Sequence, residues 1–210
     1  MDTRTGIFEN IELSHERYLT TRERYRMKDE RNRVCPVELA GGLDNKMRRW
    51  IQNPRKILEP FIKEGMRVLD VGCGPGFFTI EIANMVGDGG RVFAADIQEG
   101  MLQKIKDKTS GSQLEKRIQL IKCEQSKINA FEKVDFVLCF YMVHEVPDKN
   151  NFFRQLKDIL FPDGKILIIE PSFHVSKMGF EHTLYIAGLN GLSVMQGPKY
   201  FLNRTAVLKN

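Results

Sequence analysis

From residue 63 onward, short apolar runs alternate with segments in which apolar residues recur every three or four positions. The short runs predict five strands and the periodic segments predict four helices. We expect strands at residues 66–71, 91–95, 118–122, 134–140 and 165–170, and helices at residues 77–85, 101–108, 150–160 and 178–189. Residues 161–164 predict a turn, and residues 192–197 and 200–209 predict terminal strands. Strands that alternate with helices of this length predict a doubly wound α/β fold with a mostly parallel sheet.

Two of the predicted strands show no alternation between polar and apolar positions. Residues 134–140 read Val-Asp-Phe-Val-Leu-Cys-Phe and residues 166–169 read Ile-Leu-Ile-Ile. Central strands of a parallel sheet are covered by helices on both faces and therefore carry continuous apolar runs. We expect these two strands at the centre of the sheet.

The N-terminal part has a different pattern. Residues 1–33 are charged and poor in aliphatic residues, residues 14–33 fit a helix, and a turn at residues 35–42 follows. Two interpretations stay open for this arm: a solvated extension of mixed charge, or a helical cap that covers the site or binds a partner. We divide the chain into a charged helical arm or cap, residues 1–42, and one domain, residues 43–210.

The segment that follows the arm is amphipathic. Residues 43–62 place apolar residues at helical spacing, and Asn53-Pro54 interrupts them. Asn53 is suited to cap a helix and Pro54 to its first position. We expect two short helices that pack on the sheet.

Composition narrows the possible classes of protein. The 210 residues suit one domain with an appendage, and 42% of them are hydrophobic, enough for one sizeable core. No apolar run approaches the roughly 18 residues of a membrane span, and residues 1–6 show no signal-peptide pattern. Four cysteines without Cys-x-x-Cys spacing argue against a zinc site and for a reducing, cytoplasmic location. The net charge of +5 is compatible with an anionic substrate or a weak contact with nucleic acid and is not diagnostic of either. Runs of basic residues are usually only a solvated face, so we expect no nucleic-acid partner.

Candidate chemistry begins at the first strand. It ends in three alternating glycines, Gly72, Gly74 and Gly76, before a predicted helix, which is an arrangement that brings a ligand onto free backbone amides. The spacing differs from the Gly-x-Gly-x-x-Gly pattern of dinucleotide folds. Asp70 precedes the glycines, where a carboxylate would repel a pyrophosphate but suits an ammonium group. Asp96 ends the second strand, where an acid accepts hydrogen bonds from ribose hydroxyls. These features favour S-adenosylmethionine over a dinucleotide.

The same residues carry a family resemblance. Residues 68–77, Val-Leu-Asp-Val-Gly-Cys-Gly-Pro-Gly-Phe, together with Asp96, resemble the first two motifs of class I S-adenosylmethionine-dependent methyltransferases. Residues 134–148 are similar to the fourth-strand motif of the small-molecule subset, which includes quinone-precursor and arsenite methyltransferases. The resemblance covers roughly residues 43–209. It implies a Rossmann-like, seven-stranded sheet with one antiparallel strand.

The resemblance also implies a set of cofactor contacts. Glu124 matches an acid that contacts the adenine amino group, although the family often has glycine where Cys123 stands. Phe140 and Tyr141 are placed to flank the methionine moiety or the acceptor. The implied cofactor-binding residues are Asp70, Gly72, Cys73, Gly74, Gly76, Asp96, Ile97, Met101, Glu124, Gln125 and Phe140.

Residues after the fourth and fifth strands are candidates for acceptor chemistry. His144 is the leading candidate for a base because its imidazole titrates near neutral pH, with the alternative that it only caps its loop. Tyr141 is the second predicted catalytic residue. Glu145, Glu170, Phe173 and His174 are further candidates.

Three functions stay open from the sequence. We expect methyl transfer to a small-molecule acceptor; the alternatives are an RNA or protein methyltransferase and a non-catalytic S-adenosylmethionine-binding protein. The sequence has neither the Asn/Asp-Pro-Pro-Tyr motif of base amino-methylation nor a Pro-Cys pair for attack on cytosine. An arsenite acceptor needs several exposed thiols, and only Cys35 and Cys123 are expected to be accessible. We expect no bound metal.

Overall fold

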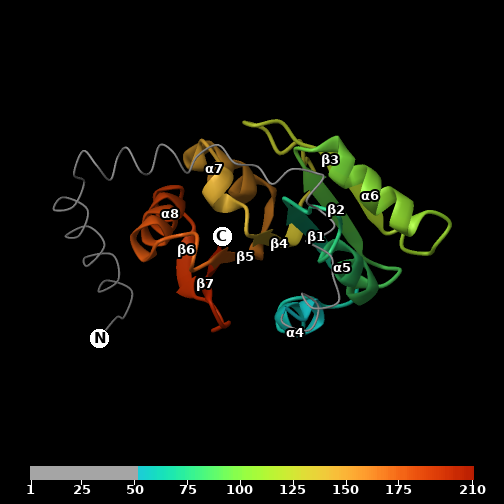
Figure 1. Cartoon of the computed structure of the whole chain (residues 1–210), viewed down its shortest axis with the longest axis horizontal. Helices are drawn as coiled ribbons and strands as arrows, with labels where there is room; N and C mark the ends of the chain where they lie inside the picture. The colour runs from blue at the N-terminus through green and yellow to red at the C-terminus, as the bar shows by residue number, and fades with distance from the viewer. Residues whose placement is uncertain (1–51) are drawn as a thin grey trace.

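The computed structural model of the chain describes residues 52–210 (Figure 1). The predicted arm of residues 1–42, its boundary with the domain, and the first of the two short helices lie outside the described residues. The second short helix is α4, Pro54–Leu58. Asn53 caps it by accepting a hydrogen bond from the Lys56 backbone N–H at 3.2 Å, and Pro54 is at its start, as predicted.

Seven strands form one sheet. Their order is β3-β2-β1-β4-β5-β7-β6. β7 is antiparallel to both of its neighbours, and the other pairs are parallel, which confirms the predicted mostly parallel sheet. The strands are β1 Arg67–Val71, β2 Arg91–Asp96, β3 Ile118–Lys122, β4 Val134–Phe140, β5 Leu160–Pro171, β6 Ser193–Gln196 and β7 Asn203–Lys209.

Helices cover both faces of this sheet (Figure 1). Because side chains alternate along a strand, Phe136 and Leu138 of β4 pack toward α4 and α5, whereas Val137 and Cys139 pack toward α7 and α8. Ala94 of β2 packs against α6. The longer helices are α5 Thr79–Val86, α6 Glu99–Thr109, α7 Lys149–Ile159 and α8 Lys177–Leu189.

The start of β5 differs from the prediction. Residues 161–164 were expected to form a turn between a helix and a strand, but β5 already begins at Leu160, directly after α7. Leu160 pairs with Val134, the register then shifts, and pairing resumes between Lys165 and Phe136. Residues 161–164 pair with neither β4 nor β7, so the predicted turn residues form an unpaired irregularity within the strand.

The order of the strands determines where a ligand binds. β1 lies between β2 and β4, so the connections leave it in opposite directions across the sheet. In open α/β sheets, ligands bind in the crevice beyond the carboxyl ends of the strands at such a reversal. The loops after β1, β2, β3 and β4 therefore meet at one place.

Candidate functional site

A cavity of about 440 Å³ lies at the carboxyl ends of these strands. Most of the site residues predicted from the sequence line it: Asp70, Gly72, Cys73, Gly74, Asp96, Ile97, Met101, Glu124, Gln125, Phe140 and Tyr141. Gly76 and His144 are not among the lining residues. The structure therefore brings together eleven of the thirteen predicted positions from the loops after four different strands.

The glycine loop lets the backbone pass close to its neighbours. Gly72 has a φ of 66°, and a Cβ atom there would lie 2.9 Å from Cβ of Met142 in the loop after β4. Gly76 has a φ of 90°, and a Cβ atom there would lie 2.9 Å from Cγ1 of Ile105 in α6. Gly74, by contrast, has nothing within 4 Å of the position of a Cβ atom. Gly72 and Gly76 thus hold the loop against the fold, and Gly74 leaves space for a ligand.

Asp96 joins the loops around the cavity. One carboxylate oxygen accepts from the Gly74 backbone N–H at 2.9 Å, and the other accepts from that of Gln98 at 2.8 Å. Its backbone carbonyl accepts from the Cys123 N–H at 2.9 Å. Burial raises the pKa of Asp96 above its ordinary value, and the backbone donors limit the rise. Each carboxylate oxygen has a second lone pair, so the group can still accept hydrogen bonds from a ligand diol.

Asp70 is a buried carboxyl group without a cation. Its side chain accepts a hydrogen bond from the Thr79 hydroxyl at 2.6 Å, and within residues 52–210 it forms no ion pair. Burial is the main reason that its pKa rises to about 7. A ligand ammonium in the cavity would favour the ionised form and lower this pKa. The site is therefore suited to a positively charged ligand.

The other end of the cavity suits a flat, mostly apolar ring. Ile97 exposes 37% of its surface although it is apolar, and Met101 lies beside it in the lining. Glu124 lines the same end, next to Gln125. An ammonium partner, a carboxylate for a diol and an apolar end with an acid match the three parts of S-adenosylmethionine. When bound, this cofactor supplies a methyl group made electrophilic by its sulfonium.

An aromatic group closes the cavity at the end of β4. The Phe140 ring lies 4.4 Å from that of Phe78 and 4.1 Å from that of Tyr141, measured between centroids. Tyr141 has a φ of 58°, which is rare for a bulky residue and indicates strain. Its hydroxyl accepts from Nε2 of Gln52 at 2.9 Å and donates to Asn203. The hydroxyl proposed from the sequence as catalytic is thus held by residues that precede α4 and begin β7.

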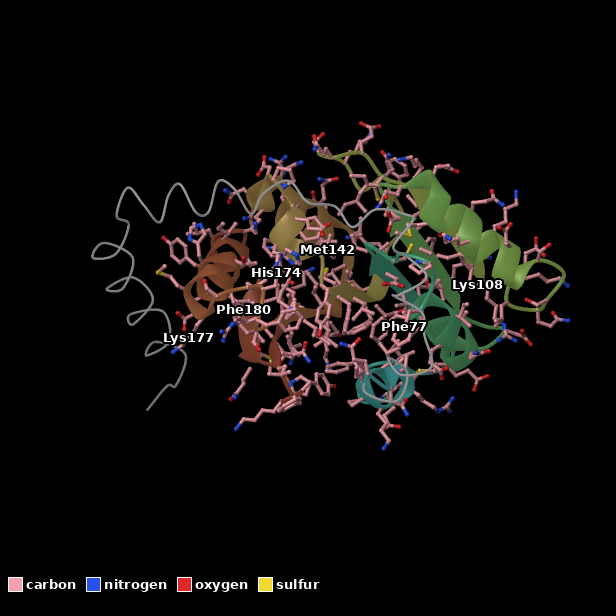
Figure 2. All side chains as sticks on the ribbon, in the orientation of Figure 1. Phe77, Lys108, Met142, His174, Lys177 and Phe180 are labelled. Atoms are coloured by element: carbon pink, nitrogen blue, oxygen red, sulfur yellow. The ribbon has the colours of Figure 1, made fainter. Side chains whose placement is uncertain are left out.

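His144 lies behind the cavity wall. It belongs to a short 3-10 helix, η3 Val143–Glu145, and its Nδ1 lies 2.7 Å from Oε2 of Glu170. Burial is the largest influence and lowers the pKa of His144, but the hydrogen bond and charge of Glu170 help to raise it above its ordinary value. Figure 2 labels Met142 and His174, which come from the loops after β4 and β5. The two imidazole rings of His144 and His174 meet edge to face, 4.8 Å apart.

Sequence reasoning missed the wall formed by the start of α7. Its residues are Val146, Pro147, Asp148, Asn151, Phe152 and Gln155, and Ser126 and Lys127 complete it. Asp148 caps α7 by accepting a hydrogen bond from the Asn151 N–H at 2.9 Å. In the sequence, Pro147-Asp148 therefore indicates the start of a helix and gives no sign of a binding site. Only the packing of α7 beside the loop after β3, where the Asn151 side chain donates to the Ser126 carbonyl, places these residues at the cavity.

The prediction that Cys123 is accessible was wrong. Cys123 is buried, and its thiol donates to the Ile128 carbonyl at 3.2 Å. Burial raises its pKa to about 12, so the thiol stays protonated. Cys73 and Cys139 are also buried, and Cys35 lies outside the described residues. Cys73 and Cys123 reach the cavity wall, but burial raises the pKa of both thiols, so neither supplies the thiolate that arsenite ligation requires.

The part of the chain that the structure describes, residues 52–210, contains no cluster of three or more His, Cys, Asp or Glu arranged to hold a metal ion. None of its helices is both long enough and apolar enough to cross a membrane.

Comparison with known proteins gives matches of three kinds. Residues 62–189 match a protein family described as a methyltransferase domain. Demethylmenaquinone methyltransferases from Lactobacillus johnsonii and Bacillus mycoides are 32% and 30% identical over 124 and 127 residues, or 57% and 59% of this chain. The chain spans about half the length of these relatives, 51% in each. A crystal structure of an S-adenosylmethionine-dependent methyltransferase from Aquifex aeolicus is 28% identical, with a TM-score of 0.74 over 84% of this chain and 98% of that one. These matches and the cavity identify S-adenosylmethionine as the cofactor.

Proposed function

The chain belongs to the methyltransferase domain family, and from this premise we propose that it transfers a methyl group to a small-molecule acceptor. The observation that carries this proposal is that one cavity offers two regions. Its floor holds the acids Asp70 and Asp96 for the cofactor, and its side after β4 offers the aromatic and ionisable residues Tyr141 and Glu145. The names of the matched relatives, demethylmenaquinone methyltransferases, support a quinone precursor or a related ring compound as acceptor.

The residues of this chain would act mainly by positioning. Asp70 would hold the ammonium of the cofactor, Asp96 would accept from the ribose hydroxyls, and Glu124 would contact the adenine amino group. Phe140, Tyr141 and Met142 would exclude water at the side where the acceptor enters. An in-line displacement of this kind needs alignment more than covalent help from the protein, because the methyl group is already electrophilic.

The cofactor site is tested by calorimetry with S-adenosylhomocysteine. Asp96→Ala removes a charged acceptor of two hydrogen bonds and is expected to weaken binding by at least about tenfold. Asp88→Ala is the matched control, because Asp88 is an exposed aspartate that pairs with Arg117 outside the cavity. Equal affinities of the two variants would contradict the proposed site.

The acceptor is tested by a screen with labelled S-adenosylmethionine. Phenols, thiols, amines and quinone precursors are offered one by one beside the RNA and protein fractions of a cell extract. Label in a small molecule supports the proposal. Label only in RNA or protein would assign the chain to the alternative functions, and cofactor binding without any transfer would indicate a non-catalytic role.

A cytoplasmic location stays a prediction. The free thiols of Cys73, Cys123 and Cys139 support it, because disulfide bonds are rare in a reducing compartment.

A further inference from the structure

The loop after β4 presents three ionisable residues to the cavity, Tyr141, Glu145 and Asp148. The Tyr141 hydroxyl is hydrogen-bonded to Asn203 and the Asp148 carboxylate caps α7, so Glu145 is the candidate for acceptor chemistry. It ends η3 and lines the cavity, whereas its neighbour His144 is not among the lining residues. Its backbone N–H donates to the Met142 carbonyl at 3.0 Å, which closes one turn of 3-10 helix. This turn directs one side chain of the pair into the cavity and the other toward β5.

The Glu170 carboxylate holds the His144 imidazole from behind. Glu170 is 1% exposed, at the carboxyl end of β5. Its Oε1 accepts from the His144 backbone N–H at 3.0 Å, and its Oε2 lies 2.7 Å from Nδ1. The other ring nitrogen, Nε2, faces Glu145, whose Oε1 lies 3.9 Å away. The His174 ring packs edge-on against the imidazole and limits its rotation.

The burial of Glu145 at the cavity wall makes its carboxyl group a base suited to neutral pH. Burial is the largest influence and raises the pKa of Glu145 to about 7; the charge of His144 lowers it, and those of Glu170 and Asp96 raise it. Burial and, to a smaller degree, Lys149 lower the pKa of His144, but Glu170 and Glu145 raise it above its ordinary value. A general base is most efficient when its pKa lies close to the working pH.

Resting on the methyltransferase function above, we propose that Glu145 is the general base that takes the acceptor's proton, with His144 and Glu170 as positioning residues. The acceptor is then a phenolic or enolic hydroxyl, whose proton has to leave. As the acceptor oxygen bonds to the methyl carbon, the carbon–sulfur bond breaks and its electron pair stays on sulfur. The hydroxyl proton passes to the Glu145 carboxylate, which then releases it to solvent.

A series of phenols with graded pKa tests this assignment. The rates are recorded at saturating S-adenosylmethionine, because the pKa of Asp70 is also about 7 and affects cofactor binding. Glu145→Gln is expected to lower kcat about 100-fold or more for phenols that are un-ionised at the assay pH. Phenols that are already ionised need no base, so their rates should stay within about threefold of wild type. Glu181→Gln, a variant of an α8 residue that pairs with Lys177, is the control and should keep the wild-type rate.

A second measurement does not depend on turnover. In the cofactor-free protein, NMR titration of His144 should show a lower pKa in Glu145→Gln and in Glu170→Gln, because each variant removes a negative charge near the imidazole. Melting curves establish that both variants fold. A His144 pKa that Glu145→Gln leaves unchanged would overturn the arrangement of the three groups.

Two activity outcomes separate the inference from the function on which it rests. An active wild type whose Glu145→Gln variant keeps its full rate with un-ionised phenols overturns the inference alone. A wild type that binds S-adenosylhomocysteine but methylates no acceptor in the screen overturns the proposed function, and the inference with it.

Discussion

Gly72→Ala offers a direct test of how the glycine loop packs. A Cβ atom at this position would lie 2.9 Å from both Cβ and Cγ of Met142, closer than side-chain carbons approach in folded proteins. The positive φ of 66° adds the strain of a left-handed conformation, about 1–2 kcal/mol for a residue with a Cβ. Overpacking against Met142 adds about 1–3 kcal/mol. We therefore expect a loss of about 3 kcal/mol, which lowers the melting temperature by about 6–12 °C in a chain of this size.

Gly111→Ala is the matched control for the backbone contribution. Gly111 has a similar φ of 70°, but nothing lies within 4 Å of the position of its Cβ atom. Its variant should lose only about 1–2 kcal/mol. The difference between the two variants then measures the steric contact with Met142.

A double-mutant cycle with Met142→Ala completes the test. Removing the Met142 side chain beyond Cβ relieves part of the clash, so the double variant should be less destabilised than the sum of the single changes by about 1 kcal/mol. Denaturant unfolding gives the free energies for the cycle. Equal losses in Gly72→Ala and Gly111→Ala, or strict additivity with Met142→Ala, would refute the proposed contact between the glycine loop and the loop after β4.

Three further predictions concern the buried carboxyl group, the core and a helix cap. Because burial raises the pKa of Asp70 to about 7, the folded state binds this proton more tightly than the unfolded chain, and cofactor-free stability falls as the pH rises from about 4 to about 7. Asp70→Asn should therefore raise the melting temperature at pH 8 more than at pH 4; an equal shift at both would contradict the sign. Phe136→Ala should cost about 3–5 kcal/mol in denaturant unfolding, since its ring is fully buried and stacks on Phe61; a loss below about 1 kcal/mol would show that the core collapses around it. Asn53→Ala should cost about 1 kcal/mol by removing the α4 cap, while Asn53→Asp should keep most of the stability.

Much of the fold was predictable because its signals are local. The bounds of β3 and β4 agree with the predicted segments to the residue, since β4 is an almost continuous apolar run and the apolar residues of β3 stand between polar segments. The Asn53 cap and the glycine loop were also found, because capping and positive φ depend on residue type at a given position. Asp70 and Asp96 follow from their places at the ends of β1 and β2, which any parallel sheet brings to the same edge.

Other features depend on contacts between residues that are distant in the sequence. Residues 161–164 lie within β5 because the residues on either side of them, Leu160 and Lys165, both pair with β4. Cys123 is buried because the loop after β3 folds back, so that its thiol donates to the Ile128 carbonyl. Which member of the pair His144 and Glu145 faces the cavity was not decided by their types. It is decided by Glu170 of β5, 26 residues further along the chain, whose carboxylate holds the His144 imidazole by a hydrogen bond on the side away from the cavity.

The sequence by itself therefore determined the sheet, the glycine loop and the acids Asp70 and Asp96 of the cavity, because each depends on a short pattern and on the parallel arrangement of the strands. Only the tertiary structure decided the side of the cavity after β4. There, α7 forms a wall of the cavity, Tyr141 is held between Gln52 and Asn203, and Glu145 lies forward of His144. These positions depend on contacts between loops that are distant in the sequence, and a local sequence pattern does not predict such contacts.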